Sequence, residues 1–205
     1  MSWIQTISGV AFDLVDSVKQ EYRIEDIAHA LSNLCRFNGH TREFYSVAQH
    51  SVLVSYTVEL AVFDQQEQIP IESRGGPEAV EELRIAGLWG LLHDASEAYL
   101  GDVTSPLKTA LRKTPFDVST YDRLEAQIMS GVCLAFGLPP VQPALVREMD
   151  LRILATERRD VMRANCARDW QLRYEPLPGV SIEPCRPGPA RDLFLHRFAE
   201  LTPRK

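Results

Sequence analysis

Cysteine, long apolar runs and positive charge are all scarce in this sequence. Its four cysteines, at positions 35, 133, 166 and 185, show neither CxxC spacing nor the density of a disulfide scaffold, so we expect reduced thiols and no zinc finger. No apolar stretch approaches the roughly 18 residues of a membrane span, and the first residues lack the basic start and apolar core of a signal peptide. These absences favour a cytoplasmic protein that does not enter a membrane.

Negative charge outweighs positive charge, with 28 Asp and Glu against 22 Lys and Arg and a net charge of −6. This overall field repels polyanions, so we expect binding neither to nucleic-acid polymers nor to a membrane surface. A phosphate-bearing ligand would need local positive charge or a metal ion. Internal repeats and low-complexity tracts are missing too, and 205 residues suit one domain with a core better than two.

The dominant pattern in the sequence is helical spacing of apolar residues. The first twenty residues instead alternate around Gly9, which predicts a short hairpin or extended arm. Residues 64–77 and the proline-rich stretch 170–189 are predicted to be loops. We therefore expect an all-α fold of five or six helices. The helices are expected at about 24–34, 44–63, from Glu78 into the segment 90–102, at about 118–136 and 142–165, and at about 191–200.

Three ionisable residues fall on the apolar faces of different predicted helices, namely His50, His93 and Asp150, and Asp94 adjoins His93. A buried carboxylate is costly unless it is paired or bound to a cation, and four such groups could offset one another around a metal ion. Neighbouring helical residues point about 100° apart, so His93 and Asp94 could share one ion only after a local adjustment of the helix. Taken singly, each histidine is more often a hydrogen-bonded core residue, and Asp150 could pair with an arginine of its own helix.

Three stretches make the pattern specific: "YSVAQHS" at 45–51, "LLHDASEAYLGDVTSPLK" at 91–108 and "REMDLRIL" at 147–154. In order and spacing they resemble the H…HD…D signature of HD-domain metal-dependent phosphohydrolases. The resemblance is greatest to the small 5′-deoxynucleotidases and the related deoxynucleotide triphosphohydrolases, and it extends over about residues 22–165.

The resemblance implies a single helical HD domain over 1–205, with 170–205 as a proline-rich extension. In that domain His50, His93, Asp94 and Asp150 would bind one divalent ion. Imidazole and carboxylate ligands suit Mn²⁺, Co²⁺, Fe²⁺, Zn²⁺ or Ni²⁺ without choosing among them, and Mg²⁺ is a further candidate. Small relatives in this superfamily are often dimers, so we also expect a homo-oligomer.

Two more carboxylates receive roles from the resemblance. Glu97 comes one helical turn after His93, on the same face, where a carboxylate can orient or deprotonate a metal-associated water. Its alternative role is a salt bridge with an arginine. Asp102 would act in catalysis or hold the nucleotide sugar, and its alternative role is to cap the helix after it.

Three residues are implied to contact substrate. "CRFNGH" places Arg36 where the relatives hold a phosphate, a role that suits its planar guanidinium, and Phe37 would pack on the sugar or base. Phe37 could instead be a core aromatic, and the deoxynucleotidases carry Trp in its place, which leaves selectivity for deoxyribose open. Lys108 would add positive charge near the phosphates, or else be a solvated surface lysine.

The predicted activity is metal-dependent hydrolysis of (deoxy)nucleoside 5′-monophosphates to nucleoside and phosphate. The same residues would also serve a triphosphohydrolase that releases tripolyphosphate from deoxynucleoside triphosphates. A guanosine-tetraphosphate hydrolase is a minor alternative, because Ala98 stands where that group has Asp. A rival of another class is a regulatory module that binds nucleotide without turnover.

Overall fold

Helices make up most of the chain in the computed structural model, which describes residues 2–67, 76–114 and 119–202. The all-α prediction is confirmed, and within the described residues no helix is both long and apolar enough to cross a membrane. The helices are α1 (Ile24–Asn33), the 3₁₀ helix η1 (Arg36–Gly39), α2 (Val47–Glu67), α3 (Pro77–Leu92), α4 (Glu97–Leu100), α5 (Ser105–Leu111), α6 (Ser119–Phe136), α7 (Ala144–Asp160) and α8 (Pro187–Leu201).

The N-terminal arm is a hairpin, as its alternating pattern predicted. Strand β1 (Trp3–Gln5) pairs antiparallel with β2 (Ala11–Asp13), and Gly9 takes a positive φ of 85° in the turn between them. Two strands alone are marginally stable in water. Phe12 supplies the missing burial, because its ring is inaccessible to solvent and stacks on Tyr99 at a centroid distance of 4.0 Å.

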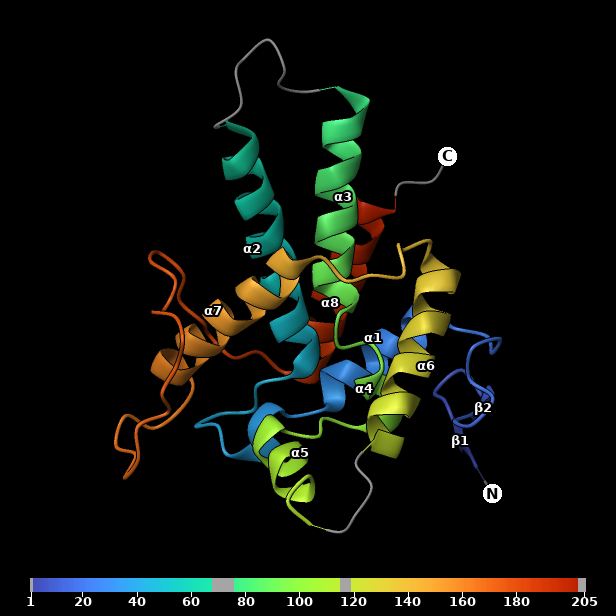
Figure 1. The fold of residues 1–205 in the computed structure, drawn as a ribbon, viewed down its shortest axis with the longest axis horizontal. Coiled ribbons are helices and arrows are strands. Elements are labelled where there is room, and N and C mark those ends of the chain that lie inside the picture. Colours follow the sequence, from blue (N-terminus) through green and yellow to red (C-terminus); the bar gives the residue numbers. More distant parts are fainter. Residues whose placement is uncertain (1, 68–75, 115–118, 203–205) are drawn as a thin grey trace.

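Helix α2 is the centre of the domain. It lies beside α3, is crossed by α7, and also contacts α1 and α8 (Figure 1). Its first six residues, 47–52, are all buried although they include Gln49, His50 and Ser51. Polar side chains at such depth need partners, and those of His50 come from the neighbouring helices described below.

Several boundaries differ from the prediction. Helix α2 continues to Glu67, so the loop predicted at 64–77 starts later, and residues 68–75 of it lie outside the described part of the chain. Helix α5, which begins at Ser105, is not among the helices expected from the sequence. Helix α7 ends at Asp160 rather than near 165, because the Arg158 guanidinium donates to the carbonyls of residues 163 and 164 and turns the chain back on the helix. Helix α8 starts at Pro187, a residue favoured in a first turn.

Helices α2 and α3 approach closely at Gly90. A Cβ at Gly90 would lie 2.8 Å from Ser55 Cα and 3.2 Å from Val54 O, both backbone atoms of α2. Backbone atoms of a packed helix cannot move aside as a side-chain end can. The substitution Gly90→Ala should therefore lower the free energy of unfolding by about 1–3 kcal/mol through overpacking, measured by urea denaturation.

Gly87→Ala is the matched control, one turn earlier on the same helix. Its Cβ would meet side-chain ends, Leu201 Cδ2 at 2.9 Å and a guanidinium nitrogen of Arg197 at 3.1 Å. Side-chain ends can shift more easily than a helix backbone, so the free energy of unfolding should fall by less than in Gly90→Ala. A Gly90→Ala protein as stable as Gly87→Ala would show that the backbone contact does not limit the packing.

Candidate metal centre

The predicted pair His93–Asp94 lies at a break between two helices. Helix α3 ends at Leu92, and residues 93–96 form a tight turn in which Ala95 N donates to Leu92 O at 3.0 Å and Glu97 N donates to Asp94 O at 3.0 Å. The break is the local adjustment that lets two adjacent side chains face the same point. The prediction that Glu97 follows His93 on one continuous helix is wrong, because Glu97 opens α4 after this turn.

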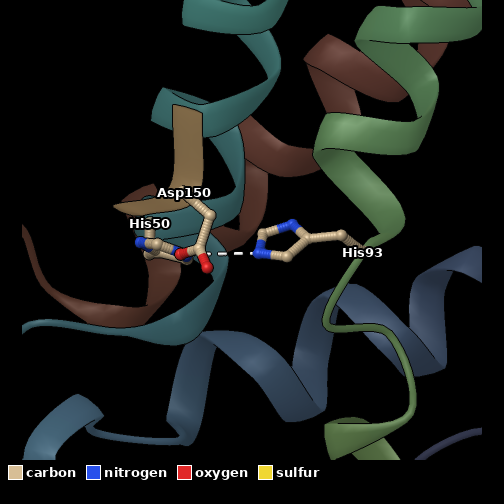
Figure 2. A group of neighbouring side chains, drawn as sticks. All are labelled: His50, His93 and Asp150. Atoms are coloured by element: carbon tan, nitrogen blue, oxygen red, sulfur yellow. Dashed lines mark hydrogen bonds and ion pairs between the residues drawn. The ribbon is translucent and has the colours of Figure 1, made fainter. Parts of the chain in front are cut away.

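Three of the predicted ligands meet from three helices. His50 comes from the first turn of α2, His93 from the end of α3 and Asp150 from α7, and Figure 2 shows His93 pointing toward the other two. His50 Nε2 lies 3.3 Å from His93 Nε2 and 3.3 Å from Asp150 Oδ1. One ligand atom of each residue lies within 4.8 Å of the others, so the group can hold a metal ion.

Asp94 lies beside this group of three. Its Oδ2 lies 3.1 Å from His93 Nε2 and 3.6 Å from His50 Nε2, so the fourth residue predicted as a ligand faces both imidazoles. Asp150 pairs with His50 rather than with an arginine of its own helix, since Arg152 is engaged by Glu148 at 3.0 Å.

The outer nitrogen of each imidazole has a partner that sets the tautomer. His93 Nδ1 donates to Gly90 O at 2.8 Å, and His50 Nδ1 donates to Glu157 Oε1 at 2.7 Å. Both Nε2 atoms are thereby left as lone-pair donors that face each other and two carboxylates. Two imidazole nitrogens and two carboxylates of this kind are a ligand set that a divalent metal accepts, so the residues fit such an ion.

The acidic surroundings also show in the pKa of His50. Burial lowers this pKa, as does the Arg36 charge, but the Glu157 and Asp150 carboxylates outweigh both and raise it to about 9. A proton on His50 is one way to balance the buried negative charge, and a bound metal ion is the other. The two compete for the same lone pair, so metal binding would release that proton.

Glu157 is a site residue that the sequence analysis missed. Its side chain is fully buried, and Arg36 Nη2 donates to its Oε2 at 3.1 Å. Arg36 Nε lies 3.0 Å from Oε1 without hydrogen-bond alignment. Burial raises the pKa of Glu157, but Arg36 and His50 hold it below its usual value. Glu157 comes two helical turns after Asp150 and so lies on the same face of α7, which could have indicated from the sequence that it is buried. The arginines at 158 and 159 made this part of the helix look exposed.

Glu97 and Asp102 lie in the field of the same carboxylates. Glu97 Oε2 is buried and accepts no hydrogen bond from the described residues, and burial together with repulsion by Asp94 and Asp102 raises the pKa of Glu97 well above its usual range. Burial also raises the pKa of Asp102, which Arg36 opposes. The alternative of Asp102 as a helix cap is wrong, since Thr104 is the N-cap of α5. Within the described chain Glu97 forms no ion pair.

The remaining predicted residues flank this group. Arg36 Nη1 lies 3.7 Å from Asp94 Oδ2, and its guanidinium carbon lies 5.4 Å from the centre of the Phe37 ring. Phe37 packs beside a small cluster centred on Tyr45. Lys108 pairs with Glu125 at 2.9 Å, so it is not a solvated lysine, and its contact with phosphates stays a prediction.

Relatives of the chain place it in a family without assigning a function. No family model matches the sequence. The uncharacterized protein YfdR of Escherichia coli is 36% identical over 205 residues, which cover 98% of this chain and 97% of YfdR. The chain belongs to the YfdR family. An uncharacterized protein of Rhodobacter capsulatus is 36% identical over 148 residues, 71% of this chain and 64% of its own length. For the YfdR family, function must therefore be argued from the site.

The buried carboxylate of Glu157 should support metal binding through His50. Glu157→Gln removes the charge that orients the imidazole and makes it more basic, so affinity for Mn²⁺ or Co²⁺ should fall by about 10- to 100-fold, measured by calorimetric titration. Glu148→Gln, which changes a half-buried carboxylate of the same helix that pairs with Arg152, should retain the affinity. If circular dichroism shows both variants to be folded and their affinities for the metal are equal, Glu157 does not support metal binding.

Proposed function

We propose that the chain is a metal-dependent phosphohydrolase of the HD type that converts (deoxy)nucleoside 5′-monophosphates to nucleoside and phosphate. The observation that carries the proposal is the convergence of two imidazole Nε2 atoms and two carboxylates from separate helices. Beside them lie the guanidinium of Arg36, which is mostly buried, and the carboxyl group of Glu97, whose Oε2 accepts no hydrogen bond from the described residues.

A metal ion and Arg36 would both stabilise the charge that develops on the phosphoryl group. A divalent ion held by His50, His93, Asp94 and Asp150 polarises a phosphoryl oxygen and lowers the pKa of a bound water when it is present. Arg36 is held by Glu157 through its Nη2 and Nε edge, which leaves Nη1 toward the ligand side of Asp94. There it can donate to a phosphoryl oxygen and offset transition-state charge.

Glu97 would accept the proton of the attacking water and pass it on. The water oxygen bonds to phosphorus as the bond from phosphorus to the 5′-oxygen breaks, and the proton passes from the water through Glu97 to the departing oxygen. The Oε2 atom of Glu97, which accepts no hydrogen bond from the described residues, is available to receive this proton. Asp102, partly buried nearby, would accept a hydrogen bond from a sugar hydroxyl.

A substrate panel tests this activity. Ribo- and deoxynucleoside mono-, di- and triphosphates are incubated with Mn²⁺ or Co²⁺, and we expect inorganic phosphate and nucleoside from the monophosphates. Tripolyphosphate from triphosphates would assign the chain to the triphosphohydrolases instead. Binding of nucleotide without any product would favour the regulatory module. Asp94→Asn should lose both the metal and the activity, and a near-normal rate would overturn the assignment of Asp94.

Glu97→Gln separates proton transfer from metal binding. Because Glu97 is assigned to the water and not to the ion, the variant should retain the metal by elemental analysis while kcat falls by about 10²- to 10⁴-fold. Glu25→Gln, an exposed carboxylate of α1, is the control and should leave kcat unchanged. A Glu97→Gln enzyme with normal kcat would require another proton acceptor.

A further inference from the structure

Trp170 lies beside Phe37 although the two residues are far apart in the sequence. Their ring centroids are 5.9 Å apart, with a tilt of 56° between the ring planes. Trp170 belongs to the segment between α7 and α8, which folds back beside α7 (Figure 1). We infer that Trp170 and Phe37 together form the surface that binds the nucleobase. This inference rests on the proposed function, because it names the part of the chain that contacts the base of the same substrate.

Trp170 is held in place yet remains partly exposed. The guanidinium of Arg158 lies over its ring, 5.4 Å from the centroid. That guanidinium is itself fixed by donating to the carbonyls of Arg163 and Ala164 at 3.0 and 2.9 Å. A rigid indole loses little conformational entropy when a flat ligand stacks on it. Such a ring is suited to binding a nucleobase through its π-face.

Contacts lead stepwise from the metal ligands to Trp170. Asp94 faces Arg36 at 3.7 Å, the Arg36 guanidinium lies 5.4 Å from the Phe37 centroid, and Phe37 adjoins Trp170. The backbone at Phe37 and Asn38 is left-handed, with φ of 55° and 52°. This conformation is uncommon at a residue other than glycine. The Phe37 ring lies beside the arginine proposed to bind the phosphate.

The charge of this region also differs from that of the whole chain. Residues 158–173 include five arginines against two aspartates, in a protein of net charge −6. Within the described residues, Arg163, Arg168 and Arg173 have no ion pair with a carboxylate. The guanidinium groups of Arg158 and Arg36 lie beside the rings of Trp170 and Phe37. Aromatic faces next to positive charge favour a ligand that is both aromatic and anionic, and a nucleotide meets both conditions.

Substrate selectivity tests the base contact. For the wild type we compare kcat/KM for deoxynucleoside monophosphates with kcat/KM for deoxyribose 5-phosphate, which keeps the phosphate and sugar but lacks the base. Trp170→Ala should lower this ratio by about 5- to 100-fold, the range expected for one base–aromatic stack, and Trp170→Phe should restore part of it. Tyr174→Ala is the matched control, because Tyr174 is a partly buried aromatic of the same segment that lies under Arg152. It should retain the ratio.

Tryptophan fluorescence supplies a readout independent of turnover. The chain has three tryptophans, at positions 3, 89 and 170. Nucleoside monophosphate added to chelator-treated protein should quench the emission of the wild type and of Trp3→Phe, but not that of Trp170→Phe. An unchanged ratio in Trp170→Ala, in an enzyme that hydrolyses nucleotides, would overturn the inference and leave the proposed function standing. Quenching through Trp170 without hydrolysis would support the base contact and overturn the activity.

Discussion

Glu157 is fully buried, and its two carboxylate oxygens face His50 of α2 and Arg36 of η1. A charge at this depth is several kcal/mol too costly to keep without close partners. The three elements that carry these residues must therefore pack together whenever the domain is folded. The same contact sets the imidazole of His50 so that Nε2 points away from Glu157 and toward His93 and Asp150. The site thus depends on a residue that is not itself among the proposed ligands.

The packing of α2 on α3 serves the site as well as the core. Gly90 permits the close approach, and its carbonyl accepts the hydrogen bond that orients His93. The turn after Leu92 then redirects the chain, so that Asp94 faces both imidazoles. The distance between α2 and α3 and the orientation of the His93 ring both depend on Gly90. A change in the packing of these two helices would therefore also move His93 Nε2.

The proposed activity would place an anionic substrate on an acidic protein. Local features offset the repulsion: Arg36 lies beside the carboxylates, a bound divalent ion would neutralise them, and residues 158–173 carry excess positive charge. Two arginines of that segment lie over aromatic rings, Arg158 over Trp170 and Arg173 over Tyr174. In this proposal the segment between α7 and α8 would contact the substrate, although the resemblance to HD phosphohydrolases covers little of it.

The sequence by itself determined the helical class, an N-terminal arm that is extended or a hairpin, and the inward faces of His50, His93 and Asp150, because periodicity is a local property of consecutive residues. It also supplied the pattern that links these residues to Asp94. The tertiary structure alone decided the role of Glu157, the break between α3 and α4, and the meeting of Trp170 with Phe37. These features depend on contacts between residues far apart in the chain, and a carboxylate next to two arginines looks exposed until the helix that buries it is in place.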